Sequence, residues 1–274
     1  MNHLLRDVAP ITESAWNLLD SEARERLTPG LAARKLVDFA GPLGWEYSAT
    51  NLGRVRALPS APADGVGAAQ RRVLPMVELR ADFTLSRAEL RDAERGAEDV
   101  DLDALAAAAR RLALAENVAV FHGWPDAGIT GIAEACTHEG VRLSEDFDAY
   151  ARHVAEAVET LLKAGIGGPY GLALGPDGYT GVIQTTEHGG FPLFDHLKKI
   201  LGGGPIVWSP GVRGAVVVSV RGGDFLFESG QDLSIGYDHH DADLVHLYLE
   251  ESFSFRVATP EAACALRPAE GAGS

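Results

Sequence analysis

Residues 45–80 read WEYSATNLGRVRALPSAPADGVGAAQRRVLPMVELR. In this stretch two extended segments, residues 46–57 and 73–80, flank residues 58–69, which are rich in Pro, Ala and Gly and poor in large apolar side chains. A hairpin inside a core would not have this composition, and an isolated two-stranded hairpin is only marginally stable in water. The sequence therefore predicts a long two-stranded arm that projects from the body and is supported by something other than its own chain.

The segment before the arm predicts an amphipathic helix. Thr12 is a suitable N-cap, and residues 28–30 (Thr-Pro-Gly) interrupt the pattern. The apolar stripe recurs at spacings of three and four, in Trp16, Leu19, Ala23 and Leu27. We expect this face to pack on the rest of the chain.

Two further helices are predicted after the arm. Residues 99–122 combine an acidic start with an alanine-rich run, and at about 1.5 Å per residue they predict a helix of roughly 30 Å or more, which is a spine rather than a connector. Its apolar face contains Leu102, Leu105, Ala109, Leu112 and Ala113. Ser144 is predicted to cap the other helix, which ends at Gly165.

The chain beyond residue 165 predicts strands with helical segments between them. Residues 170–174, 206–208 and 215–220 are apolar and strand-like, whereas residues 191–201 have a helical pattern. A long period-two run follows, in Val245, Leu247, Leu249, Phe253, Phe255 and Val257. No regular βαβ repeat is present, so we predict the α+β fold class.

The composition argues against several classes of partner. The 274 residues contain 24 Lys and Arg against 39 Asp and Glu, a formal net charge of −15. This acidity disfavours binding of nucleic acid or an anionic membrane through bulk electrostatics. The N-terminus lacks the apolar core of a secretory signal, and the longest strongly apolar stretch, residues 215–220, is too short to span a bilayer. We therefore expect a cytoplasmic protein with no nucleic-acid or membrane partner.

Motifs of the common catalytic chemistries are missing. The sequence contains no GxSxG, GxxxxGK or HExxH pattern. Residues 238–243 (DHHDAD) carry side chains that can bind a divalent metal, which leaves a small metal-dependent hydrolase as an alternative, but we favour a solvated turn between two strands. Cys136 and His138 are interpreted as an unreactive thiol and its neighbour, because no third orienting group is evident. We predict a protein that is not an enzyme, with no cofactor and no metal.

Six segments carry a resemblance to a known family. They are LLRDVAPIT (4–12) with Trp16, GPLGWEYSA (41–49), FTLSRAEL (83–90) leading into ERG (94–96), GPY (168–170), RGGDF (221–225) and GQDLSIGY (230–237). In this order they resemble the family 1 encapsulin nanocompartment shell proteins, also called the linocin/bacteriocin-like family. The resemblance extends over nearly the whole chain.

The resemblance implies an HK97-type phage-capsid fold. It places an N-terminal helix and the start of a peripheral domain in residues 1–47, an extended E-loop in 48–80, the spine helix of the peripheral domain in 81–130, an axial domain in 131–220, and peripheral strands with the C-terminal tail in 221–274. Family protomers self-assemble into an icosahedral shell, here expected to have roughly sixty copies, around a cargo enzyme. A phage major capsid protein that packages DNA is the alternative within this fold.

The resemblance also implies a cargo-peptide site. Family shells bind the C-terminal targeting peptide of the cargo, commonly a dye-decolourising peroxidase or a ferritin-like enzyme of iron storage and oxidative stress, between the N-terminal helix and the peripheral domain. Matching positions are Leu27, Leu31, Arg34, Asp38, Asp232, Leu233, Ile235 and Tyr237. Arg34 and Asp38 are expected to fix the polarity of the peptide on an apolar groove. The alternative is that the apolar residues only pack the helix onto its own domain.

Two further expectations come from the resemblance. Residues 185–190 (TTEHGG) match the five-fold pore loop, which places Glu187, His188 and Gly189 at a pore. Protonation of His188 at about pH 6 is then expected to change the passage of ions through the pore, and an ordinary solvated histidine is the alternative. Some members hold a flavin on an exposed Trp, and the matching position here is Ala88, so no flavin is expected.

Overall fold

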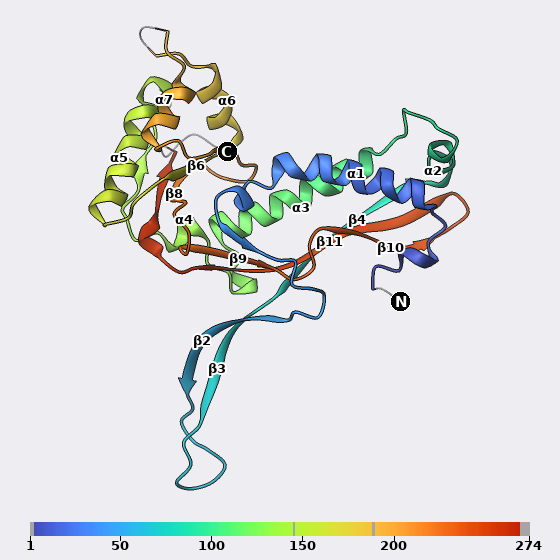
Figure 1. The fold of residues 1–274 in the computed structure, drawn as a ribbon, viewed down its shortest axis with the longest axis horizontal. Helices are drawn as coiled ribbons and strands as arrows, with labels where there is room; N and C mark the ends of the chain where they lie inside the picture. Colours follow the sequence, from blue (N-terminus) through green and yellow to red (C-terminus); the bar gives the residue numbers. More distant parts are fainter. Residues whose placement is uncertain (1–2, 145, 188–189, 269–274) are drawn as a thin grey trace.

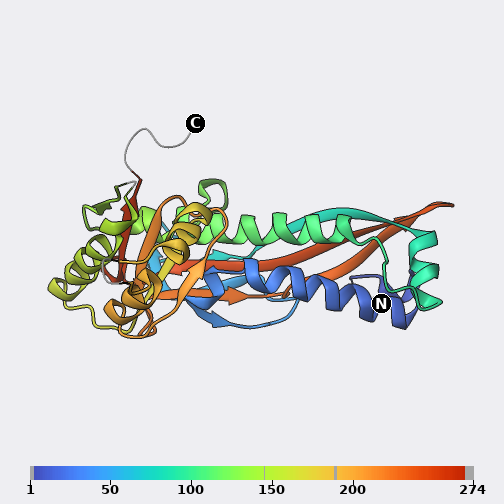
Figure 2. The same cartoon turned by 90° about the horizontal axis from the view of Figure 1, so that it is seen from above.

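The structure is a computed structural model that describes residues 3–144, 146–187 and 190–268. It has an elongated body, a second group of helices and strands at one end of it, and a hairpin arm that leaves the body (Figure 1). Seen at right angles, the body is long and narrow, with its two longest helices running along it (Figure 2).

The body is built on a sheet in which β11 (Leu244–Val257) is the longest strand. β11 pairs antiparallel with β10 (Ser234–His240), with β4 (Val77–Ser86) and, near its end, with β9 (Phe225–Ser229). The short β1 (Asp38–Ala40) joins β9 in parallel. The predicted period-two run thus becomes a strand that contacts three others.

Two long helices cover this sheet. α1 (Glu13–Gly30) and α3 (Asp103–His122) lie side by side (Figures 1 and 2), and α2 (Arg87–Glu94) follows β4. The predicted stripes of both long helices are buried against the sheet; we call this packing the body core. It includes Trp16, Leu19, Leu27, Leu105, Leu112, Leu247 and Leu249.

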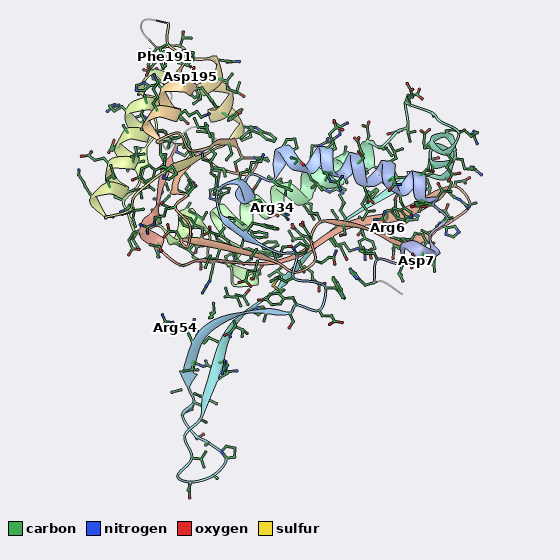
Figure 3. The ribbon with its side chains drawn as sticks, viewed as in Figure 1. Arg6, Asp7, Arg34, Arg54, Phe191 and Asp195 are labelled. Carbon is green, nitrogen blue, oxygen red and sulfur yellow. The ribbon has the colours of Figure 1, made fainter. Side chains whose placement is uncertain are left out.

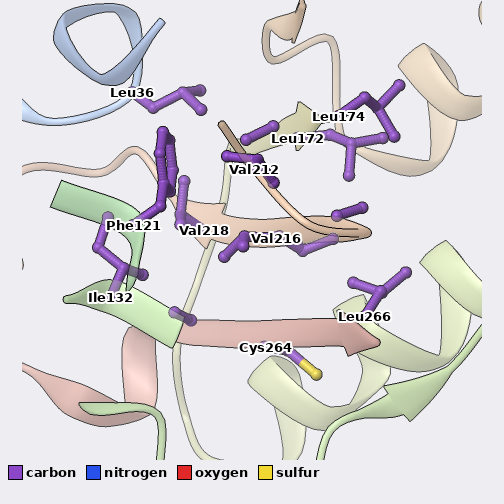
Figure 4. Packing of buried hydrophobic residues seen from close by; sticks show 14 of the residues in the cluster. Leu36, Phe121, Ile132, Leu172, Leu174, Val212, Val216, Val218, Cys264 and Leu266 are labelled. Carbon is purple, nitrogen blue, oxygen red and sulfur yellow. The ribbon is translucent and has the colours of Figure 1, made fainter. Parts of the chain in front are cut away.

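The second group of elements has its own sheet, in the order β5 (Val141–Arg142), β12 (Ala263–Arg267), β8 (Ala215–Ser219), β6 (Tyr170–Leu174) and β7 (Ile206–Trp208). Four helices accompany it, α4 (Ile132–Ala135), α5 (Tyr150–Lys163), α6 (Pro176–Gln184) and α7 (Leu193–Ile200). Its packing, which we call the distal core, includes Phe121, Leu172, Val216, Cys264 and Leu266 (Figure 4).

A two-stranded arm is present, but its second strand begins earlier than the predicted residues 73–80, and residues 77–80 belong to β4 in the body sheet, where they pair with β11. β2 (Ala49–Ala57) and β3 (Ala69–Pro75) pair antiparallel as a separate two-stranded sheet, and Figure 1 shows them projecting away from both cores. Tyr47 and Thr50 fix the base of the arm, because each hydroxyl donates a hydrogen bond to Glu228 Oε2, at 2.7 and 2.6 Å. Beyond that base the side chains are largely exposed, and Val55 is 65% exposed.

Three helix boundaries differ from the prediction. α3 begins at Asp103, four residues after the predicted start at residue 99. α1 continues through Pro29 to Gly30. A proline there removes one N–H in the last turn, but the N–H of Leu31, two residues later, still donates to the Leu27 carbonyl at 3.0 Å. α5 begins at Tyr150 rather than after Ser144, because Asp146 caps a preceding 3₁₀ turn through its Oδ1, which accepts from the Asp148 N–H at 3.0 Å.

Candidate functional site

A groove of about 380 Å³ lies between α1, the 3₁₀ turn η2 (Ala33–Lys35) and the start of β10. Six of the eight residues predicted for a cargo-peptide site line it: Leu27, Leu31, Arg34, Asp232, Leu233 and Ile235. They come from segments more than 190 residues apart in the chain, which the fold brings together.

The middle of the groove is apolar. Leu27 and Ile235 are buried in its floor, with 4% and 1% of their surfaces exposed. Leu31 and Leu233 are half-buried, so part of each side chain is open to the groove. Such an arrangement can accept apolar side chains of an extended segment.

Charged pairs flank the apolar middle. Arg6 donates to both carboxylate oxygens of Asp20, at 3.2 and 2.8 Å, and its guanidinium lies 4.1 Å from the centre of the Trp16 ring. Arg34 donates through NH1 to Asp232 Oδ1 at 2.7 Å. Arg6 and Arg34 lie at separate places along α1 (Figure 3).

Two predicted residues lie outside the groove. Asp38 is exposed in β1, and its Oδ2 accepts a hydrogen bond from the Gly223 N–H at 2.6 Å. It therefore does not pair with Arg34. Tyr237 belongs to the body core, and its hydroxyl is 2.6 Å from His240 Nδ1.

Arg34 is held by three carboxylates. Besides Asp232, its Nε donates to Glu116 Oε2 and its NH2 to Glu251 Oε2, each at 2.7 Å. Its guanidinium also faces the Phe39 and Phe227 rings, 5.0 and 5.4 Å from their centres. Burial lowers the pKa of Arg34, but the charges of Glu116 and Glu251 outweigh this effect, so the pKa lies above its ordinary value.

Glu116 and Glu251 were not among the predicted site residues. Each of them nevertheless stands at a position where its sequence pattern predicts a buried apolar residue. Glu116 continues the buried stripe of α3 four residues after Leu112, and Glu251 occupies the inward position between Leu249 and Phe253 in the period-two run. A carboxylate at an inward position is unusual and needs a partner.

The predicted pore loop lies between α6 and α7. Glu187 lies at the base of this loop, and its two carboxylate oxygens are 2.8 and 2.7 Å from His196 Nδ1. Phe191 follows the loop (Figure 3), and Lys199 Nζ lies 4.3 Å from the centre of its ring. His188 and Gly189 lie outside the described residues.

The other candidates have structural partners. Asp241 forms a turn, because its Oδ1 accepts from the N–H groups of Asp243 and Leu244 at 2.8 Å. Within residues 3–144, 146–187 and 190–268, no group of three His, Cys, Asp or Glu side chains is arranged to hold a metal. Cys136 Sγ donates to the Ala263 carbonyl at 3.0 Å, and His138 Nε2 contacts the Glu261 carbonyl at 2.9 Å.

Comparison with known proteins identifies the family. The family model described as "Encapsulating protein for peroxidase" matches residues 1–254. A type 1 encapsulin shell protein of Rhodospirillum rubrum is 48% identical, with 97% of each chain covered. The chain belongs to the type 1 encapsulin shell proteins. The corresponding protein of Brevibacterium linens is 41% identical over 97% of this chain and 99% of its own.

Solved structures show the fold of this encapsulin chain. A virus-like particle from Pyrococcus furiosus matches with a TM-score of 0.59 and 19% identity, covering 90% of this chain and 98% of the other. The capsid of a GTA particle matches with a TM-score of 0.52 and 15% identity, covering 88% and 90%. The predicted α+β, HK97-type capsid fold is confirmed.

The encapsulin family also defines the class of protein. Its relatives are named as shell proteins, so this chain is a structural shell protein rather than an enzyme, and it forms a capsid-like assembly of many copies. Among the helices of the described residues, none has the length and apolarity needed to cross a membrane.

Proposed function

We propose that this encapsulin forms a nanocompartment and that the groove between α1 and β10 binds the C-terminal targeting peptide of a cargo enzyme. The observation that carries the proposal is the groove itself, with its apolar middle and its charged pairs at Arg6–Asp20 and Arg34–Asp232. Apolar anchors of a peptide would fill the middle, and the charged pairs would fix its direction.

The comparisons support a cargo without naming it. The family description refers to a peroxidase. A relative from Kuenenia stuttgartiensis, 26% identical over 93% of this chain and 73% of its own, is named as a fusion of a diheme cytochrome with an encapsulin shell. A redox enzyme such as a peroxidase is therefore the cargo class we propose, and a ferritin-like protein, which the family resemblance implies, is the alternative.

The proposal is tested by cargo loading. Ile235→Asp places a carboxylate in the groove floor, and we expect intact shells of this variant to co-purify with little cargo. Because Ile235 is buried, Leu233→Ala is the second variant: Leu233 is half-buried, so the shell is retained while an apolar contact is removed. Leu244→Ala, an exposed position at the far end of β11, is the control. Undiminished loading by both groove variants contradicts the proposal.

We also propose that the arm is the E-loop and that it lies on a neighbouring copy. Residues 48–80 would form this loop, and residues 131–220 the axial domain. The arm has no core beneath it, and it carries Arg54, Arg56, Arg71 and Arg72 against the single acidic Asp64 between residues 49 and 75. Because the chain as a whole has a net charge of −15, such a basic arm is opposite in net charge to the rest of a neighbouring protomer.

The proposed number of copies is sixty. A closed shell of sixty copies of the 29.1 kDa chain has a mass of about 1.7 MDa, which size-exclusion with electron microscopy measures. A stable monomer would refute assembly through the arm. A particle that carries nucleic-acid absorbance would favour the DNA-packaging alternative.

The pore proposal concerns Glu187, His188 and Gly189 at a five-fold opening. If five copies of His188 surround it, protonation adds positive charge to the ring between about pH 5.5 and 7.5, and cation uptake slows as the pH falls. Stopped-flow uptake of a small cation by intact shells tests this. Identical kinetics across that interval contradict the proposal.

A further inference from the structure

A polar junction separates the two cores of the protomer. On α3, Leu105 and Leu112 belong to the body core, and Phe121 belongs to the distal core. On β11, Leu249 belongs to the body core and Phe253 to the distal core. Glu116 and Glu251 lie where each element passes from one core to the other, and we call this place the acidic junction.

The charges at the acidic junction do not balance if every group is ionised. Arg34 NH2 lies 2.6 Å from Glu116 Oε2 and 2.7 Å from Glu251 Oε2, so one nitrogen serves both carboxylates. Asp232 adds a third carboxylate on the same arginine. One cation therefore faces three acidic groups.

Burial makes this imbalance costly. The side chains of Glu116 and Glu251 are 0% and 1% exposed, whereas that of Asp232 is 40% exposed and reaches water. The second oxygen of each buried carboxyl, Oε1, has no hydrogen-bond partner among the described atoms. Two buried, adjacent carboxylates with unsatisfied oxygens are strongly disfavoured unless one of them is neutral.

We propose that Glu116 and Glu251 hold one proton between them at neutral pH, and that this acid–carboxylate pair positions Arg34 in the wall of the groove. A proton on one carboxyl turns it into a donor toward the other, which removes the imbalance within the pair. Arg34 then balances the remaining carboxylate, and its NH1 stays directed at Asp232 in the groove.

The surroundings of the pair support this assignment. Burial raises the pKa of both carboxyls, and that of Glu251 well above its ordinary value; the neighbouring Glu116 raises it further, while Arg34 opposes the shift. The charged groups facing the pair are Arg34 from η2 and Asp232 from the segment before β10. Asn117, next to Glu116 on α3, is turned away and donates to the Gly30 carbonyl at 2.7 Å.

The proton makes the junction sensitive to alkaline pH. Because the folded-state pKa lies above the unfolded value, the proton's contribution to stability is complete below the ordinary pKa of glutamate and is lost as the pH rises through the raised pKa. Loss of the proton leaves a second buried charge, and the junction relaxes by admitting water. The Arg34 end of the groove loses its fixed geometry in the same pH range.

The test uses assembled shells of the wild type and of Glu251→Gln. In the wild type at neutral pH we expect an infrared carbonyl band of a protonated carboxylic acid, shifted by D₂O, that Glu251→Gln lacks. We also expect wild-type stability toward guanidinium to fall with rising pH relative to the variant, by up to tenfold in the unfolding equilibrium constant per pH unit, because the amide mimics the neutral acid.

Controls keep the outcome decisive. If Glu251→Gln does not assemble, Glu116→Gln replaces it, since either amide substitutes for the protonated partner. Glu22→Gln on α1, where Glu22 pairs with Arg26, should leave the band and the pH slope unchanged. Absence of the band in the wild type, or a band and slope that persist in the glutamine variant, overturns the proposal.

The effect on the groove rests on the proposed cargo function and has its own readout. A synthetic cargo C-terminal peptide should bind wild-type shells more weakly at alkaline pH and bind Glu251→Gln shells equally at both pH values. If the band is present but the peptide binds no shell at any pH, the cargo proposal fails and the proton assignment stands. If the peptide binds the wild type with an affinity independent of pH, the positioning role of the pair is refuted.

Discussion

Removal of the Arg34 guanidinium should be among the most damaging single changes in the protomer. Arg34→Met keeps the length and apolar stem of the side chain, but it leaves Glu116 and Glu251 buried without a cation. Breaking a buried ion pair in this way costs about 3–5 kcal/mol. The carboxyls respond by binding protons, so the loss should be largest at alkaline pH and smaller under mildly acidic conditions.

This loss can be measured as a shift in denaturation midpoint. For denaturation by guanidinium chloride, the m-value of a chain of this size is about 6 kcal/mol/M. A loss of about 4 kcal/mol in the free energy of unfolding therefore lowers the denaturation midpoint of assembled shells by about 0.7 M. Arg6→Met is the matched control, because Arg6 lines the same groove but pairs with Asp20 at the surface, with side-chain exposures of 27% and 36%. Its loss should be about 1 kcal/mol or less, or about 0.2 M.

The comparison between the two variants shows whether the acidic junction depends on Arg34. If Arg34→Met lowers the midpoint no more than Arg6→Met does in alkaline buffer, the acidic junction does not depend on Arg34. If the difference between the variants fails to shrink as the pH is lowered, the carboxyls are not taking up protons in response.

Two other predictions concern the distal core. A Cβ at Gly204 would overlap the Tyr170 carbonyl oxygen on β6, so Gly204→Ala should lower the free energy of unfolding by about 3 kcal/mol or more. Gly167 has open space around it, so Gly167→Ala should change that free energy by no more than about 0.5 kcal/mol. Equal denaturation midpoints for the two variants would contradict this. Burial, with Cys136 and Glu156, raises the pKa of Cys264 to about 12, so at pH 8 only about 10⁻⁴ of it is thiolate. Mass spectrometry after iodoacetamide should therefore find Cys264 unmodified in native shells and modified once denatured, and equal labelling in both states would refute the assignment.

Periodicity predicted the elements better than it predicted their ends. The stripe through Leu105 and Leu112 indicated α3, and the alternation through Leu247 and Phe255 indicated β11, because burial of one face constrains every repeat. The start of α5 was misplaced, since Ser144 and Asp146 are both suitable caps and only the folded chain selects between them.

The candidate site was predictable in part. Leu27 and Leu233 were placed by resemblance, and the fold brings them to one groove. Asp38 was expected to fix the polarity of the peptide together with Arg34, but it lies outside the groove. Besides the predicted Asp232, Arg34 is held by Glu116 and Glu251. Each of these carboxylates could be recognised in the sequence as an acidic residue at a position expected to be buried and apolar. Local patterns do not predict that two such residues, 135 positions apart, meet at one arginine.

The unsupported hairpin of β2 and β3 has a consequence for how shells form. In the protomer Val55 is exposed and β2 and β3 form a sheet of their own, so if the arm lies on a neighbouring copy as proposed, its folded state is complete only when that copy is bound. In that arrangement, each added copy covers the arm of one neighbour and its own arm is covered by another. Shell formation should therefore resemble crystallisation, with a critical protein concentration, a lag before growth and few half-built particles, because the stability of every chain depends on the number of chains present.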